Sequence, residues 1–249
     1  MTKTVLITGA GSGFGKGAAI ELARRGHDVI ATTETQEQAD GLAATHPELR
    51  VMKLDVTDAA DVAGAADLGV DVLINNAGVG VLAPMATVPM DQVRLSFDVN
   101  VFGMVAMSQA VIPGMRERGG GRIINVSSIA GVIASALGSP YCMTKHAVEA
   151  FTKSLRAELA PHGIDVTKVN PGPYATGFND RMVDAILGYL DDGDTSAQET
   201  HAFVSEVVLN DQLDPTEVSN ALADLAEADA TPEERFLPEG ILDALAELL

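Results

Sequence analysis

The sequence predicts a doubly wound α/β fold, with a mostly parallel sheet covered by helices on both faces. Strand-like and helix-like segments alternate about six times along the first two thirds of the chain. The strand-like segments, such as TVLIT at 4–8 and VDVLINNAG at 70–78, are continuous apolar runs. Such strands are buried on both faces, which is typical of parallel sheets between two helix layers. Because no linker, repeat or low-complexity tract interrupts the pattern, we expect one domain over residues 1–249.

The individual elements follow from local signals. Helical spacing over Lys16–Arg25 stops at Gly26, a residue that favours helix C-termini. A helix at 214–228 is expected to begin with Asp214 as its cap, Pro215 at the first position and Glu217 three residues after the cap. The other strands are expected at 28–33, 50–56, 121–128, 164–172 and, at one edge, 234–240. The other helices are expected at 36–44, 59–68, 91–118 and 141–159, with two in a substrate-loop region at about 173–213 and an amphipathic one at the C-terminal end.

Composition narrows the function classes. The 249 residues are 47% hydrophobic and carry a formal charge of -19, so nucleic acid and anionic membrane surfaces are poor partners. The one cysteine, Cys142, cannot form an internal disulfide. We see no leader peptide and no apolar run near the roughly 20 residues that span a bilayer. These observations predict a soluble, cytoplasmic protein that binds small molecules, with no metal ligand set.

A glycine-rich turn, TGAGSGFG at 8–15, follows the first strand and opens the first helix. Gly9, Gly13 and Gly15 would permit a tight turn and close helix–strand packing, with Ser12 and Phe14 between them. The helix N-terminus and backbone N–H groups would receive a pyrophosphate. The spacing matches neither GxGxxG nor a P-loop, so a simple tight turn is the alternative. Its position between strand and helix favours a dinucleotide site.

The ends of the second and third strands indicate which nicotinamide cofactor is bound. Glu34 could accept hydrogen bonds from the adenosine ribose hydroxyls and would repel a 2′-phosphate, which favours NAD over NADP. Asp55, followed by Val56, could accept a hydrogen bond from the adenine amino group. Alternatively, Glu34 is only a solvated residue at the start of the next helix, and Asp55 only caps the helix that follows it.

Polar residues end the later strands, where ligands bind in an open α/β sheet. The motif NNAG at 75–78 supplies Asn76, Ala77 and Gly78, NVSS ends in Ser128, and NPG ends in Gly172. Asn100 lies inside an expected helix, where an amide is a mildly poor helix former. It could serve the site, or its amide could be bonded to backbone groups and have only a structural role.

Tyr141 and Lys145 are four residues apart, so on a helix they share one face about 6 Å apart. A nearby ammonium lowers the pKa of a tyrosine, which could then exchange a proton with an alcohol oxygen. Ser128 would hydrogen-bond the same oxygen. A surface pair without function is the alternative.

Together, TGAGSGFG, NNAG, the Asn in DVNVFG, NVSS, YCMTK and NPG resemble the short-chain dehydrogenase/reductase family over residues 4 to about 177. The resemblance implies a Rossmann-like fold, with Tyr141 as general acid/base and Lys145 lowering its pKa and holding the nicotinamide ribose. It implies that Ser128, rather than Ser127, positions the substrate oxygen and that Asn100 holds a relay water. Asn76 is placed near the adenosine, and Pro171, Gly172 and Thr176 face the nicotinamide.

Two departures from the family pattern concern assembly and the third helix. The chain ends RFLPEGILDALAELL rather than in a strand with a Gly-Gly tail, so a tetramer is in doubt and a homodimer or homotetramer stays open. The segment between Asp55 and NNAG is also short.

The expected substrate is a secondary alcohol or ketone with an apolar or aromatic body. The stretch before Tyr141 is apolar, and the loop after the sixth strand offers a further set: Tyr174, Phe178, Met182 and Ile186, with Arg181 as the exception. The sequence thus predicts an NAD-dependent alcohol dehydrogenase or carbonyl reductase. The alternatives are an NADP-preferring carbonyl reductase, a non-catalytic NAD(P) sensor or scaffold, and a lyase, epimerase or dehydratase of the related extended type.

Overall fold

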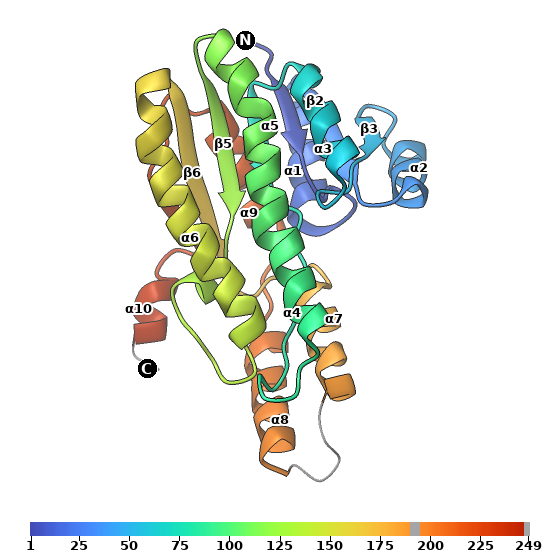
Figure 1. Ribbon diagram of the computed structural model, residues 1–249, viewed down its shortest axis with the longest axis vertical. Helices are drawn as coiled ribbons and strands as arrows, with labels where there is room; N and C mark the ends of the chain where they lie inside the picture. The colour runs from blue at the N-terminus through green and yellow to red at the C-terminus, as the bar shows by residue number, and fades with distance from the viewer. Residues whose placement is uncertain (190–194, 247–249) are drawn as a thin grey trace.

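A seven-stranded parallel sheet forms the centre of the computed structural model, which describes residues 1–189 and 195–246. The strand order is β3-β2-β1-β4-β5-β6-β7, and all pairs are parallel. Figure 1 shows the strands with helices in front of and behind them. The strands are β1 (Thr4–Ile7), β2 (Asp28–Thr33), β3 (Arg50–Lys53), β4 (Val72–Asn75), β5 (Gly121–Val126), β6 (Ile164–Pro171) and β7 (Glu234–Leu237). The doubly wound parallel fold expected from the apolar strands is confirmed.

The chain winds outward from β1 to β3 and then returns to β4 on the other side of β1. This reversal leaves a crevice at the carboxyl ends of β1 and β4, where an open α/β sheet binds its ligand. Sequence motifs TGAGSGFG and NNAG both lie there, because one follows β1 and the other ends β4. The topology alone therefore joins two motifs that are more than sixty residues apart.

Helices cover the two faces of the sheet. One core contains buried residues of α1 (Gly13–Arg24), α2 (Gln36–Thr45) and α9 (Thr216–Glu227). The other contains buried residues of α5 (Met104–Glu117) and α6 (Ser139–Leu159). The remaining helices are α3 (Ala59–Gly64), α4 (Met90–Phe97), α7 (Phe178–Ile186), α8 (Thr195–Leu209) and α10 (Ile241–Ala246), with short helical turns η1 (Ala65–Leu68), η2 (Asp98–Gly103), η3 (Ile129–Gly131), η4 (Ala160–His162) and η5 (Leu187–Tyr189).

One continuous helical stretch, Met90–Glu117, runs through α4, η2 and α5. Contrary to the expectation of no such run, it is long and apolar enough by length and composition to cross a bilayer. A core helix meets the same criteria, and here Met107, Val111 and Met115 are buried in the core against the sheet.

The structure corrects several boundaries. β3 ends at Lys53, so Asp55 lies in the following turn and does not end the strand. Helix α9 begins at Thr216 with Pro215 in the cap position, although the Asp214 carboxylate still accepts a hydrogen bond from Thr216 N. Glu217 does not close a capping box, because its carboxylate binds the hydroxyl of Tyr174. Residues 190–194 of the expected substrate loop and 247–249 of the expected C-terminal helix lie outside the described residues.

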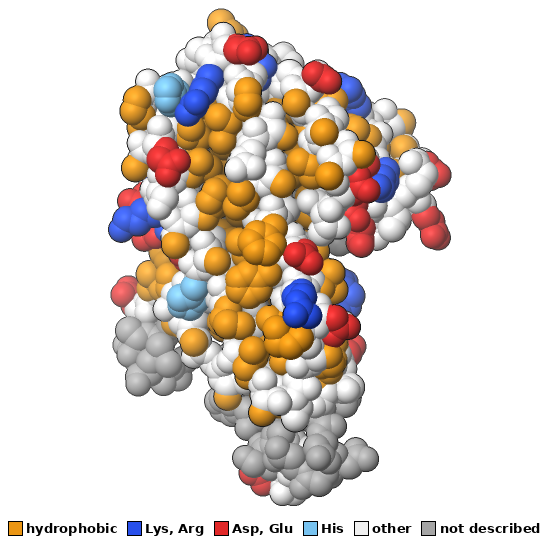
Figure 2. All heavy atoms as spheres, viewed as in Figure 1, with side chains coloured by type: hydrophobic (Ala, Val, Ile, Leu, Met, Phe, Trp, Pro, Cys, Tyr) orange, Lys and Arg blue, Asp and Glu red, His pale blue; other side chains and the backbone are white. Residues whose placement is uncertain are grey.

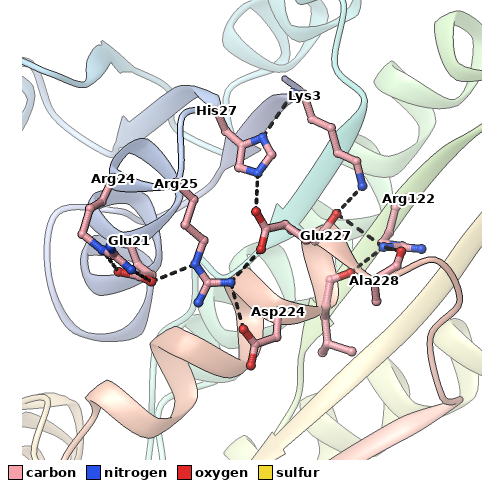
Figure 3. Close-up of polar contacts among 11 residues, drawn as sticks. Lys3, Glu21, Arg24, Arg25, His27, Arg122, Asp224, Glu227 and Ala228 are labelled. Carbon is pink, nitrogen blue, oxygen red and sulfur yellow. Dashed lines mark hydrogen bonds and ion pairs between the residues drawn. The ribbon is translucent and has the colours of Figure 1, made fainter. Parts of the chain in front are cut away.

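An ionic cluster closes the opposite, amino end of the sheet (Figure 3). Arg25 at the end of α1 contacts Asp224 and Glu227 of α9 at 2.9 and 2.7 Å. His27 binds the same Glu227, and Lys3 donates to the carbonyl of Ala226 at 2.6 Å. Cations at the C-terminal carbonyls of a helix are favourable, so the cluster fastens α9 to the β1–α1–β2 unit.

Candidate active site

The glycine turn between β1 and α1 requires glycine at three positions. Gly9 has φ +65°, and a Cβ there would lie 2.8 Å from the Cα of Ala77. Gly13 has φ +54°, and its Cβ would lie 3.2 Å from the Cβ of Thr176. At Gly15 a Cβ would meet the Asn76 amide at 2.4 Å. A side chain at any of these positions would clash with a neighbour, and at Gly9 and Gly13 it would also strain the backbone. Glycine therefore lets the turn lie close to NNAG and to the loop after β6.

Thr8 and Asn76 fasten this turn to the end of β4. The Thr8 hydroxyl oxygen accepts hydrogen bonds from the backbone N–H groups of Asn76 and Ala77, both at 3.0 Å. The Asn76 side chain donates to the carbonyls of Thr8 and Gly9 at 3.0 and 2.9 Å. Asn76 therefore shapes the turn, a role that the sequence analysis missed, as it missed Thr8. A threonine at the end of the first strand was the available signal.

The first turn of α1 can receive a pyrophosphate. Ser12 is the N-cap residue and makes no side-chain capping hydrogen bond. The N-terminal N–H groups of a helix carry partial positive charge, and here Ser12, Gly13 and Phe14 line a cavity. The uncapped helix start and the glycine cradle fit a dinucleotide cofactor.

At the adenosine end, Glu34 is exposed and lines the same cavity, as do Asp55 and Val56. Asp55 accepts hydrogen bonds from the backbone N–H and the hydroxyl of Thr57 at 2.8 and 2.7 Å. The cap of α3 is Asp58, so the alternative reading of Asp55 as the helix cap is wrong.

Asn100 lies buried in η2, a π-helical turn, and both its amide oxygen and its amide nitrogen are hydrogen-bonded to protein groups. Its oxygen accepts from Val79 N at 2.8 Å, and its nitrogen donates to the carbonyl of Val79 at 2.8 Å and to Thr144 Oγ1 at 3.1 Å. This is the backbone-bonded arrangement that the sequence analysis held as the structural alternative. Thr144 thus helps to position Asn100.

Tyr141, Lys145 and Ser128 line the cavity together, on α6 and at the turn after β5. The Lys145 ammonium lies 5.6 Å from the centre of the Tyr141 ring and donates to the carbonyl of Val126 at 3.0 Å. Ser128 Oγ accepts from the backbone N–H of Ala130 at 3.1 Å. The i, i+4 pair and the serine predicted from the sequence are therefore neighbours in space.

Burial dominates the electrostatics of this pair. It raises the pKa of Tyr141 well above its usual value, with the Ser128 hydroxyl acting in the opposite direction. The expectation of a lowered tyrosine pKa is therefore not met in the protein alone, because desolvation of the phenolate is the largest effect on the pKa of Tyr141. Burial also lowers the pKa of Lys145 to about 8, opposed by the charge of Glu149.

The cavity measures about 830 Å³, and most of the residues expected to hold cofactor or substrate line it. Gly15 and Asn100 do not, since both act behind the wall. The lining residues from the expected set are Gly9, Ser12, Gly13, Phe14, Glu34, Asp55, Val56, Asn76, Ala77, Gly78, Ser128, Tyr141, Lys145, Pro171, Gly172 and Thr176.

The substrate side of the cavity is mostly apolar. Phe178 and Met182 of α7 line it with Leu82, and the Phe178 ring lies 5.9 Å from that of Tyr141. Ile186 is buried in the same cluster without lining the cavity. Tyr174 is almost wholly buried, and its hydroxyl donates to Glu217 at 2.7 Å rather than toward a substrate.

Sequence reasoning missed two further parts of the wall. Leu82 belongs to the loop after β4, and Ile241 and Ala244 come from α10 near the end of the chain. A Cβ on Gly172 would lie 2.5 Å from Ile241 Cδ1, so α10 packs directly on the loop after β6. The apolar residues of the C-terminal amphipathic pattern were the available signal.

Comparison with known proteins agrees with this geometry. The short chain dehydrogenase family model matches residues 3–186. The chain is 38% identical to the uncharacterized oxidoreductase YusZ of Bacillus subtilis, over 90% of this chain and 84% of the relative. It is 37% identical to 3-ketodihydrosphingosine reductase of Bacteroides thetaiotaomicron, over 76% and 70% of the two chains.

A solved structure with the same architecture is a closed form of serine dehydrogenase complexed with NADP+. Its TM-score is 0.79 at 30% identity, with 94% of each chain covered. The fold therefore binds a nicotinamide cofactor, and this likeness gives the NAD preference no support. The family model, the relatives and the assembled Ser128, Tyr141 and Lys145 agree: the chain belongs to the short-chain dehydrogenase family of oxidoreductases.

Proposed function

We propose that the protein transfers a hydride between NAD(H) and a secondary alcohol or ketone with an apolar or aromatic body, with Tyr141 as general acid/base. The observation that carries the proposal is the placement of Tyr141, Lys145 and Ser128 in one cavity with the glycine turn. The glycine turn supports cofactor binding, and the three side chains support proton transfer beside it.

The cofactor, when bound, supplies or accepts the hydride. The protein supplies orientation and the proton. Burial raises the pKa of Tyr141, so its hydroxyl stays protonated at neutral pH and can donate to a carbonyl oxygen. Ser128 Oγ accepts from Ala130 N, and its hydroxyl, which contacts Tyr141 in the protein alone, can donate its own proton to a bound substrate oxygen. Both donors then stabilise the negative charge that develops on that oxygen.

Lys145 provides the positive charge of the site. Its ammonium lies 5.6 Å from the Tyr141 ring centre, close enough to stabilise a phenolate after proton transfer. Its hydrogen bond to the carbonyl of Val126 uses one of three donors. The remaining two donors are available to the nicotinamide ribose, as the family resemblance implies.

Glu34 supports NAD as the preferred cofactor. It is exposed on the cavity wall just beyond β2, where its charge would repel a 2′-phosphate. The cationic side chains among the described lining residues are Lys145 and Arg181. Neither belongs to the adenosine end, because Lys145 neighbours Tyr141 and Arg181 belongs to α7.

An NADP-preferring carbonyl reductase is the second candidate. The serine dehydrogenase structure, which was solved with NADP+, favours it. The ratio of kcat/KM with NADH to that with NADPH distinguishes the two cofactors. A ratio above one supports the NAD proposal, and a ratio below one supports the alternative.

The apolar wall supports an apolar substrate. Leu82, Phe178 and Met182 offer no charge to a polar chain, and the 3-ketodihydrosphingosine reductase relative is named for a ketone substrate. Burial of apolar substrate surface is worth about 25 cal/mol per Å². A larger apolar ketone should therefore have the higher kcat/KM until it fills the cavity.

The test is a turnover assay on purified protein. NADH or NADPH is mixed with a panel of ketones from acetone to aryl and long-chain alkyl ketones, and loss of reduced-cofactor absorbance is followed. We expect turnover that increases with apolar size. Absence of turnover with every ketone and with the matching alcohols, while the cofactor still binds by calorimetry, would instead identify a cofactor sensor.

We also propose that the protein forms a homodimer through the face of α4 and η2. Figure 2 shows apolar side chains gathered over this helical stretch. Met90, Leu95 and Phe102 are 53%, 43% and 60% exposed there. An exposed apolar patch on one helix face is typical of a contact with a second chain.

A further inference from the structure

A cluster of polar side chains extends from Ser127, on the wall of the active-site cavity, into the protein behind it, and it has no part in the proton transfer described above. We call it the Glu149 cluster: Ser127, Glu149, Lys168, Asn170 and Glu234. Glu149 Oε1 accepts from the hydroxyl of Ser127 and from Asn170 Nδ2, the latter at 2.6 Å. Its other oxygen pairs with Lys168 Nζ at 2.7 Å. One carboxylate therefore joins α6 to the ends of β5 and β6.

The charges of the cluster alternate in sign from Glu149 through Lys168 to Glu234, which reaches the surface. The side chain of Glu149 is 15% exposed and that of Lys168 only 4%. Lys168 also pairs with Glu234 at 3.0 Å, whose side chain is 44% exposed on the edge strand β7. A buried ion is costly unless it is paired and hydrogen-bonded, and Glu149 meets both conditions.

The cluster holds the turn that carries Ser128. Asn170 Nδ2 donates to the backbone carbonyl of Ser128 at 3.1 Å as well as to Glu149. Ser127, the preceding residue, binds Glu149 through its side chain. Ser128 is thus held by its own carbonyl and by its neighbour, and both restraints end at the same carboxylate.

Glu149 also faces the active-site lysine. It lies one helical turn after Lys145 on α6, and residues four apart share a helix face. Its negative charge favours the charged form of Lys145, which burial disfavours. Among the titratable and charged groups on α6 and the elements packed against it, Tyr141, Cys142 and Lys168 lie nearest the pair, and Glu234 binds Lys168. The remaining groups on these elements are Asp91, Arg94, Asp98, His146, Lys153, Arg156, Glu158, His162 and Asp165.

We propose that Glu149 is a positioning residue of the active site, which fixes the turn of Ser128 and holds the positive charge on Lys145. The inference rests on the proposed function for the roles of Ser128 and Lys145. Two variants separate its two effects. Glu149→Gln keeps an oxygen that can accept from Ser127 and Asn170 but removes the charge, whereas Ser127→Ala removes one restraint and keeps the charge.

The first measurement is the titration of Lys145, followed by NMR of protein labelled with ¹³C-lysine. The signal is assigned by its loss in Lys145→Met. We expect the titration midpoint to fall by about one pH unit in Glu149→Gln, because the compensating carboxylate is lost. The matched control is Glu158→Gln, an exposed carboxylate on the same helix. Its midpoint should stay within about 0.2 of wild type, since exposed charges are screened.

Lys168→Met is an independent test, in which the titration midpoint of Lys145 should shift in the opposite direction. Removing this cation should raise the Lys145 midpoint, because a like charge is lost. The Lys168→Met variant still tests the charge role if Glu149→Gln fails to fold. A Glu149→Gln midpoint equal to that of the Glu158→Gln control, or a Lys168→Met midpoint at or below wild type, overturns the charge role.

The second measurement is ketone reduction. Ser127→Ala should lose about tenfold in kcat with KM for NADH unchanged and the Lys145 midpoint unshifted, because a misplaced Ser128 weakens only the transition state. A kcat within twofold of wild type overturns the positioning of Ser128. The NMR titration needs no turnover. A protein that transfers no hydride but shows the Glu149→Gln shift would therefore refute the proposed function and leave the charge role standing.

Discussion

At the scale of single residues, burial decides how Tyr141 and Lys145 titrate. Lys145 is buried and Tyr141 is half-buried on the cavity wall, and desolvation favours the neutral form of each: the pKa of the tyrosine goes up and that of the lysine goes down. The protein alone therefore keeps a proton on Tyr141 and holds Lys145 near its point of titration. A protonated Tyr141 hydroxyl beside the Lys145 ammonium suits the reduction of a carbonyl group, because the tyrosine can donate its proton to the carbonyl oxygen.

This burial predicts a pH dependence of stability. The pKa of Lys145 is about 8 in the folded protein, against 10.5 for the free side chain. Between these values the unfolded chain binds more protons, so the free energy of unfolding should rise with pH. Chemical denaturation of cofactor-free protein at pH 8 and 10 should show a rise of about 2 kcal/mol from this group. The rise should be absent in Lys145→Met, and an equal rise in that variant would assign it to other groups.

The charge of Glu34 should determine whether the protein prefers NADH or NADPH. Glu34→Arg replaces the carboxylate that repels a 2′-phosphate by a guanidinium that binds one. We expect the NADH-to-NADPH ratio of kcat/KM to fall by about a hundredfold, roughly 3 kcal/mol of discrimination. Glu37→Arg, on the first turn of α2, is the control for charge alone. An equal change in both variants would show that net charge, rather than position 34, sets the preference.

At the scale of elements, close packing joins the cofactor turn to helices far along the chain. The Ser219 hydroxyl of α9 donates to the carbonyl of Phe14 at 3.3 Å, and the Tyr174 ring meets the Phe14 ring edge-on with centroids 5.6 Å apart. Tyr174 in turn is bound by Glu217 of α9. The glycine turn and the loop after β6 thus share one support.

Two glycines in helices should therefore respond in opposite ways to alanine. A Cβ on Gly17 would lie 2.8 Å from Ser219 Cβ, so Gly17→Ala should force α1 and α9 apart and destabilise the protein by about 1–3 kcal/mol. A Cβ on Gly41 meets nothing within 4 Å, so Gly41→Ala should stabilise α2 by about 0.5–1 kcal/mol. Thermal unfolding of both variants checks the pair. Equal effects would contradict the described packing.

The sequence predicted the elements with long or continuous apolar patterns. The doubly wound parallel sheet followed from the strand–helix alternation and the continuous apolar strands, whereas its strand order, which brings TGAGSGFG next to NNAG, comes from the structure. Local signals failed where tertiary contacts compete: Glu217 suggested a capping box but binds Tyr174, and β3 stops before Asp55. The contacts of Thr8, Glu149 and α10 could not be predicted, because they depend on which strand ends become neighbours.

At the scale of the whole molecule, charge and exposed apolar surface act in opposite directions. A net charge of -19 makes copies of the chain repel one another at low ionic strength. The patch on α4 and η2 favours association, and Phe102 is its most exposed member. Dimer formation should therefore strengthen as salt screens the repulsion.

Phe102→Asp should abolish that dimer. The change removes an exposed aromatic ring and adds a like charge to an acidic surface. Light scattering at fixed salt should show a monomer for Phe102→Asp and the wild-type mass for the apolar control Phe102→Leu. A dimer in Phe102→Asp would place the contact elsewhere.

Single-turnover hydride transfer in Tyr141→Phe tests the role of the Tyr141 hydroxyl most directly. Enzyme loaded with NADH is mixed with an apolar aryl ketone, and cofactor oxidation is followed by stopped flow at pH 7. We predict a rate at least about 10²-fold below wild type, since the proton donor is lost, with NADH affinity within twofold. A Tyr141→Phe rate within a few-fold of wild type would contradict the central claim that the Tyr141 hydroxyl carries the proton.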